Sequence, residues 1–204
     1  MAERLEVRFA GSGGQGIILM GLILAEAAGL FEGKFVCQTQ SYGPEARGGA
    51  AKAEVVISEA EIDYPKALQP DILVAMNQAA ADIYGLDLKH GGLLLVDRTL
   101  VRDFPSPKAI ALPFTATARQ EIRRELMANI IALGALVRLS GIVSRGSVEK
   151  ALLKRAPAGT AAVNLQALGV GIKLAEEFLA HHIPKCLEEV GEMAPPSQEL
   201  SKEG

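Results

Sequence analysis

A glycine-rich turn between a short apolar strand and a long apolar helix constrains the fold of this chain more than any other feature. Residues 5–10, LEVRFA, have the pattern of a buried strand. Residues 17–30, IILMGLILAEAAGL, form an apolar run long enough for a helix that packs on a sheet. The six residues between them are GSGGQG. A strand, a glycine-rich turn and a helix in this order predict the first unit of an α/β fold.

The rest of the chain continues the alternation. We predict further strands over residues 34–40, 51–58, 71–77, 91–97 and 108–114. After residue 114 the pattern becomes helical, with a break in the first long segment and with Ser147 as the cap of the next helix. This order predicts a doubly wound, mostly parallel sheet with helices on both faces and a helical C-terminal part. We expect a single domain over residues 1–191 and a polar, proline-rich, disordered tail over residues 192–204.

Composition excludes several classes of function. The formal charge of −3 does not favour a nucleic-acid partner, which would select a basic face. No apolar run reaches the roughly 18 residues that a membrane span needs, and the N-terminus lacks a signal-peptide pattern, so we expect a cytoplasmic protein. Cys37 and Cys186 stand far apart, and the three histidines lack zinc-site spacing. We therefore expect neither an iron–sulfur cluster nor a structural metal in this chain.

The GSGGQG turn is the first candidate site. Its spacing fits G-x-G-x-x-G, and a helix N-terminus behind such a turn offers free N–H groups to a phosphate. The alternative is a purely structural turn. NAD is disfavoured because the next strand ends in QTQ, without the acidic residue that would hold the ribose. The candidate ligand-binding residues are Gly11, Ser12, Gly13, Gly14, Gln15 and Gly16.

A second candidate lies in SYGPEARGG, residues 41–49, which connects two predicted strands. Ligands of open α/β sheets bind outside the carboxyl ends of the strands. We expect that edge to receive GSGGQG, the start of SYGPEARGG, Asn77, Asp97 with Arg98, and the loop at Phe114. The alternative is a surface hairpin with an ordinary Glu–Arg pair. The candidate residues are Ser41, Tyr42, Gly43, Pro44, Glu45, Arg47, Gly48 and Gly49.

Asn129 is a third, isolated candidate because it stands inside the apolar segment MANIIALGALV. Its amide either hydrogen-bonds to a neighbouring loop, as a structural cap, or contacts a ligand.

The motifs GSGGQGI, QTQSYGPEARGG and ANIIALGAL, in this order, resemble the gamma subunit of the 2-oxoacid:ferredoxin oxidoreductases, which include the 2-oxoglutarate and pyruvate enzymes. The resemblance covers roughly residues 5–180 and implies a Rossmann-like domain. It also implies a complex that oxidatively decarboxylates a 2-oxoacid with coenzyme A, giving an acyl-CoA and reduced ferredoxin. The gamma subunit is expected to lack activity alone.

The same resemblance implies the partners. Thiamine diphosphate and iron–sulfur clusters are expected on alpha, beta and ferredoxin-like delta subunits, and coenzyme A is the ligand implied for the glycine-rich turn. SYGPEARGG is then expected at the interface with the catalytic subunits, near the substrate or coenzyme A channel.

Two alternatives remain open on sequence alone. One is a free-standing nucleotide-dependent oxidoreductase, and the other is an interaction module whose turn binds nothing. Within the family, the sequence does not select the 2-oxoacid, and an indolepyruvate enzyme remains a candidate.

Overall fold

A computed structural model describes residues 4–42, 50–104, 109–157 and 159–182 of the chain. These residues form a sheet of six strands. The spatial order is β2-β3-β1-β4-β5-β6. The strands are β1 (Arg4–Ser12), β2 (Phe35–Tyr42), β3 (Ala50–Ser58), β4 (Ile72–Ala75), β5 (Leu93–Asp97) and β6 (Ile110–Leu112). The predicted α/β architecture is therefore confirmed, with all six expected strands present.

One strand runs against the others. β3 is antiparallel to both of its neighbours, β1 and β2, whereas β1, β4, β5 and β6 pair in parallel. Because β1 and β2 are both antiparallel to β3, they point the same way. The carboxyl ends of five strands thus lie at one edge of the sheet. The base of the β2–β3 hairpin lies at the same edge, because Ala51 pairs with both Tyr42 and Gly11.

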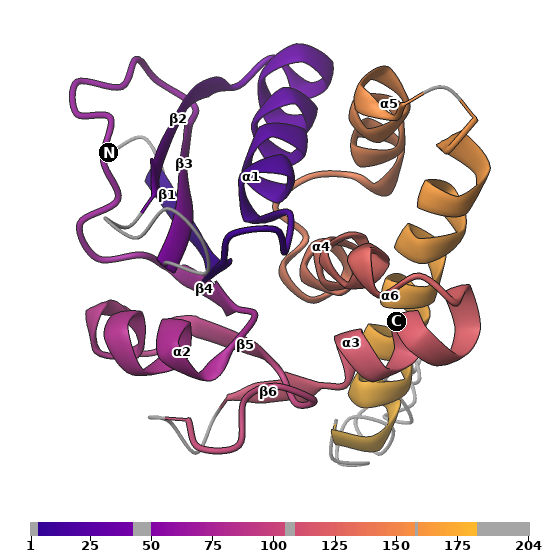
Figure 1. Cartoon of the computed structure of the whole chain (residues 1–204). Helices are drawn as coiled ribbons and strands as arrows, with labels where there is room; N and C mark the ends of the chain where they lie inside the picture. The colour runs from indigo at the N-terminus through magenta and orange to yellow at the C-terminus, as the bar shows by residue number, and fades with distance from the viewer. Residues whose placement is uncertain (1–3, 43–49, 105–108, 158, 183–204) are drawn as a thin grey trace, which may run out of the picture.

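Helices cover both faces of the sheet, as expected (Figure 1). The helices α1, α4, α5 and α6 lie on one face and α2 on the other. The α-helices are α1 (Ile17–Glu26), α2 (Gln78–Tyr84), α3 (Phe114–Thr117), α4 (Ala128–Ser140), α5 (Arg145–Arg155) and α6 (Ala161–His182). Shorter helical turns are η1 (Ala27–Phe31), η2 (Gly85–Asp87), η3 (Ala118–Ile122) and η4 (Glu125–Met127).

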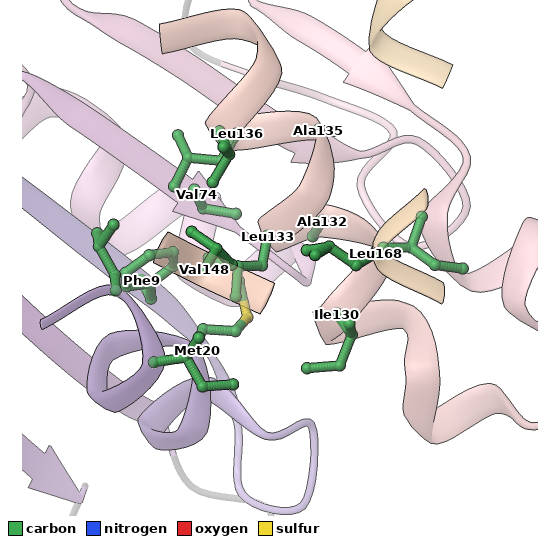
Figure 2. Packing of buried hydrophobic residues seen from close by; sticks show 14 of the residues in the cluster. Phe9, Met20, Val74, Ile130, Ala132, Leu133, Ala135, Leu136, Val148 and Leu168 are labelled. Carbon is green, nitrogen blue, oxygen red and sulfur yellow. The ribbon is translucent and has the colours of Figure 1, made fainter. Parts of the chain in front are cut away.

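The main core fills the space between the sheet and the four-helix face, where Phe9 and Val74 of the sheet meet Met20, Leu133 and Leu136 (Figure 2). A smaller core under α2 uses the opposite sides of the same strands. Alternate residues of a strand point to opposite faces, so both sides of β4 are apolar, whereas the side of β1 that carries Ala10 also carries the buried, charged Glu6 and Arg8.

One helix boundary differs from expectation, and the expected break in a helical segment can now be located. The cap of α5 is Ser144, whose hydroxyl accepts a hydrogen bond from the N–H of Ser147, so the prediction of Ser147 as the cap was wrong by one turn. The expected break in the helical segment after residue 114 falls at Arg123, which has a left-handed backbone with φ 58°.

The described part of the chain includes no helix that is both long and apolar enough to cross a bilayer. Residues 183–204, which include Cys186 and the predicted tail, lie outside the described residues, as do residues 43–49.

Candidate functional site

The glycine-rich turn is shorter than its sequence suggests. β1 continues through Gly11 and Ser12, and α1 begins at Ile17, so only Gly13–Gly16 make the turn. Gly14 and Gly16 adopt left-handed backbone, with φ 92° and 74°, which side-chain-bearing residues rarely do.

The four glycines have two different roles. A Cβ added to Gly11 or Gly16 would overlap neighbouring side chains, which are those of Gln15 and Ile17 at Gly11 and Asn129 at Gly16. Gly13 and Gly14 are exposed, and an ideal Cβ on either has no other heavy atom within 4 Å. The first pair is therefore needed for packing, whereas the second pair leaves open space next to the backbone.

Side-chain hydrogen bonds fix the turn against the end of β4. Gln15 accepts a hydrogen bond from the N–H of Ser12 at 2.7 Å and donates one to the carbonyl of Met76 at 3.1 Å. Asn77 donates to the hydroxyl of Ser12 and accepts from the N–H of Ala80, which caps α2. Gln15 and Asn77 thus hold the shape of the candidate site, and their amides already have internal partners.

Asn129 contacts the same turn from the other side. It is 4% exposed, and its amide nitrogen lies 3.4 Å from the carbonyl of Gly16. The structure therefore agrees with the capping alternative given above for this residue.

The N-terminus of α1 faces this turn without a side-chain cap. Gly16 occupies the cap position, and the first turn of α1 contains no acidic residue. The first N–H groups of a helix carry partial positive charge and bind anions well. Exposed glycines in front of an uncapped helix provide the access that an anionic group needs.

A cavity of about 190 Å³ opens beside Gly14. Its walls are mainly apolar and come from the turn, the end of β4, α3, η4 and α4: Gly14, Gln15, Met76, Thr115, Glu125, Leu126 and Ala128. Leu126 is 69% exposed although it lines the cavity.

Asp97 fixes one wall of this cavity. Its carboxylate is fully buried at the end of β5 and accepts hydrogen bonds from the hydroxyl and the N–H of Thr115 and from the N–H of Thr99. Asp97 therefore lies at the expected edge but holds Thr115 rather than reaching solvent. Phe114, which was expected in a loop, is instead a buried residue of α3.

An ion pair lies at the rim. Arg119 donates to Glu125 at 2.8 Å, and both side chains are more than half exposed. This hydrogen bond holds the pKa of Glu125 below its ordinary value near 4.5 and raises the pKa of Arg119. Glu125 is therefore ionised at neutral pH, with its charge balanced by Arg119.

The second candidate lies largely outside the described residues. Ser41 is exposed and Tyr42 ends β2, whereas Gly43, Pro44, Glu45, Arg47, Gly48 and Gly49 are not described. The register of β1, β2 and β3 brings the base of this connection to the edge that carries the glycine-rich turn.

Sequence reasoning missed the walls that Met76, Thr115 and Leu126 contribute to the cavity. An apolar or small polar residue at a strand end or in a helical segment gives no sign that it faces a cavity, and no short motif connects these three positions.

Comparisons with known proteins agree with the sequence motifs. A family model described as pyruvate ferredoxin/flavodoxin oxidoreductase matches residues 6–174. The chain is 52% identical over 179 residues to the 2-oxoglutarate synthase subunit KorC of Methanocaldococcus jannaschii, and this alignment covers 86% of the chain and 96% of the relative.

Two solved structures are similar over most of the chain. The gamma subunit of a keto/oxoacid ferredoxin oxidoreductase from Geobacter sulfurreducens has a TM-score of 0.79 and 47% identity, covering 86% of this chain and 98% of that one. The 2-oxoglutarate:ferredoxin oxidoreductase from Magnetococcus marinus, with 2-oxoglutarate, coenzyme A and succinyl-CoA bound, has a TM-score of 0.74 and 27% identity. The match covers 86% of this chain but 31% of that longer chain.

Proposed function

The chain belongs to the pyruvate ferredoxin/flavodoxin oxidoreductase family and is a gamma subunit of its multisubunit 2-oxoacid:ferredoxin oxidoreductases. From this premise we propose that its complex oxidises 2-oxoglutarate and that this subunit contributes the glycine-rich turn to the binding of coenzyme A. The choice of 2-oxoglutarate is supported by two relatives, the 2-oxoglutarate synthase subunit at 52% identity and the 2-oxoglutarate:ferredoxin oxidoreductase at 27% identity.

The observation that carries the coenzyme A proposal is the open space at Gly13 and Gly14 in front of the uncapped N-terminus of α1. Coenzyme A has phosphate groups and a long, weakly polar pantetheine arm. The helix N–H groups suit a phosphate. The adjacent cavity suits a short part of the arm, since about 190 Å³ is far too small for the whole molecule.

The residues of this chain would bind and orient coenzyme A rather than take part in the reaction. Gln15, Asn77 and Asn129 hold the turn in the shape that leaves Gly13 and Gly14 accessible. Arg119 neutralises Glu125, which reduces the repulsion between this carboxylate and an approaching phosphate.

The partners belong to the same proposal. Alpha and beta subunits would hold thiamine diphosphate, which supplies the carbanion chemistry of decarboxylation, and a ferredoxin-like delta subunit would pass electrons to ferredoxin. SYGPEARGG would contact the catalytic subunits, because its base lies at the edge that carries the glycine-rich turn. Such a complex would work in the cytoplasm.

The substrate assignment is tested by activity. The purified chain alone should be colourless and should not reduce a viologen dye with any 2-oxoacid. After co-expression with its partner subunits, kcat/KM for 2-oxoglutarate should exceed those for pyruvate and indolepyruvate by at least about tenfold, equivalent to about 1.4 kcal/mol. A preference for another 2-oxoacid, or turnover by the lone chain, would overturn the assignment.

The coenzyme A assignment is tested by Gly13→Val in the assembled complex. The added side chain occupies empty space in the free chain, so the fold should be retained. The apparent KM for coenzyme A should rise at least about tenfold, a loss of about 1.4 kcal/mol of binding, with little change for 2-oxoglutarate.

The matched control is Gly146→Val, which alters an equally open, exposed glycine in α5. This glycine is remote from the glycine-rich turn. The N-terminus of α5 contacts Glu32, which follows the C-terminal end of α1, whereas the turn lies at the N-terminal end of α1. Equal changes in the KM of both substrates in Gly13→Val would indicate a structural turn instead.

A further inference from the structure

The outer edge of β2 is long and has no partner strand within the described part of the chain. β2 spans eight residues at the end of the sheet and pairs with β3 on one side only. Outside this β2–β3 ladder, none of the backbone hydrogen bonds among the described residues involves residues 35–42. Alternate N–H and C=O groups of an edge strand point away from the sheet and are available to another strand.

β2 also lacks the features that usually keep an edge strand from pairing. Its sequence, FVCQTQSY, contains no charged residue and no proline. The opposite edge strand, β6, has three residues and is followed directly by Pro113. Short strands, charges and proline are common protections against edge-to-edge pairing. One edge of this sheet is thus protected, whereas the other is suited to pairing.

Exposed apolar side chains lie on both sides of the amino end of β2. Leu30 and Phe31 are 60% and 38% exposed in η1, which packs against β2 and continues from α1. Phe35 is 50% exposed and pairs with Ser58, which in turn pairs with Arg4. Directly paired residues lie on the same face of a sheet, so Phe35 lies on the face of Arg4, opposite to the face that η1 covers. A helix placed on one face would cover only one of these groups. An added strand covers both, because its side chains alternate between the faces.

We propose that an extended strand of a partner subunit pairs with the outer edge of β2 and carries apolar side chains where it passes Phe35. This inference rests on the proposed assembly with catalytic subunits. A partner subunit is favoured as the source because the chain is a gamma subunit of a multisubunit enzyme, and because the corresponding unit in the Magnetococcus marinus enzyme is part of a longer chain. Strand addition is a common mode of recognition in which main-chain hydrogen bonds supply much of the affinity.

Hydrogen exchange measured by mass spectrometry tests this pairing in the free chain and in the purified complex. In the complex, about half of the amides in residues 35–42 should exchange at least tenfold more slowly, since about half face outward. Residues 51–58 of β3, which already pair on both sides, should change little.

A pair of substitutions tests the same edge. Phe35→Lys combined with Gln40→Lys places charge at two exposed positions of β2 and should weaken assembly of the complex at least tenfold. The control is Leu86→Lys, which changes an 85% exposed leucine in η2 and should leave assembly unchanged. The melting temperature of each free variant shows whether it is folded.

The outcomes separate this inference from the proposed function. An active complex in which residues 35–42 exchange as fast as in the free chain overturns the strand pairing and leaves the proposed function intact. Absence of any complex overturns both.

Light scattering and hydrogen exchange on the free chain test the two other possible partners of the β2 edge, which are a second copy of this chain and another part of the same chain. A dimer with protected β2 amides would assign the edge to a second copy, and a monomer with protected amides would assign it to another part of this chain. Either result overturns the proposal.

Discussion

At the scale of single residues, Gly16 and Asn129 show how the candidate site is held in place. Gly16 occupies the N-cap position of α1 with φ 74°, and its missing side chain leaves the space that the Asn129 amide fills. Asn129 in turn donates to the Gly16 carbonyl. A left-handed backbone and a close side-chain contact thus coincide at one position, so only glycine fits there.

Gly16→Ala should therefore destabilise the chain. Residues held in unfavourable backbone regions cost on the order of 1–3 kcal/mol, and the new methyl group must also displace Asn129. Urea unfolding should show this loss. Gly13→Ala is the control, because its Cβ enters open space, and it should change stability by less than about 0.5 kcal/mol. Equal effects of the two substitutions would contradict this division of roles.

At the scale of elements, α4 and α6 pack with their backbones in contact. A Cβ on Gly134 would overlap the carbonyl of Leu168, and a Cβ on Gly171 would overlap the carbonyl of Ile131. Side chains can rotate away from a new atom, but the backbone of a packed helix cannot do so without moving the helix. The two glycines therefore set how closely these helices approach.

Gly171→Ala is expected to lower the free energy of unfolding by about 1–3 kcal/mol, the usual cost of overpacking a core. Gly169→Ala, two residues away on α6, has nothing within 4 Å of its new Cβ. It should be neutral or stabilise the helix by about 0.5–1 kcal/mol, because alanine restricts the unfolded chain more than glycine does. Thermal unfolding of both variants compares them, and a neutral Gly171→Ala would show that the helices separate easily.

The Arg119–Glu125 pair connects η3 to η4 across the break at Arg123. Because the pKa of Glu125 is lower in the folded chain, its contribution to stability is present above its unfolded pKa and is lost as the pH falls through the folded value. The pair should thus persist at neutral pH and break only under acidic conditions, below the ordinary carboxyl pKa near 4.5. In Arg119→Gln, an NMR titration should find the pKa of Glu125 raised towards its ordinary value. An unchanged pKa would mean that the pair does not form in solution.

The order of strands and helices was predictable because each element has its own local pattern. The GSGGQG turn marks the first strand–helix step, and Asn129 stood out as the amide of an otherwise apolar helix. The position of β3 between β1 and β2 was not predictable, because side-chain periodicity within a strand carries no information on which strand lies beside it. The break at Arg123 was anticipated but not located, because neither glycine nor proline marks it.

At the scale of the whole molecule, the candidate site combines segments far apart in the sequence. The cavity beside Gly14 needs Met76, Thr115 and Leu126 from three other segments. Their convergence follows from the parallel strands, whose carboxyl ends meet at one edge. The general location of the site could therefore be derived from the fold class, whereas the residues of the cavity wall required the structure.

Arg47→Ala tests whether the connection after β2 serves the complex rather than the single chain. We expect the free variant to unfold at nearly the same temperature as the parent chain. Assembly or turnover of the reconstituted complex should fall at least about tenfold, because truncating one member of a buried ion pair at an interface costs on the order of 2–5 kcal/mol. A complex that assembles and turns over like the parent would indicate an exposed pair, worth about 0–1 kcal/mol at most.

The central place of β1 has a consequence for how the chain is made. β1 leaves the ribosome before its two neighbours, β3 and β4, which begin only at Ala50 and Ile72. The gap from Ser12 to Ile72 is about 60 residues, which takes roughly 3–12 s at ordinary rates of translation. Neither edge of β1 has a partner until β3 has been made, and the edge that pairs with β4 stays open for the whole of this time. A nascent chain of this subunit should therefore offer chaperones an early binding site at β1, and that site should disappear once β4 has been made.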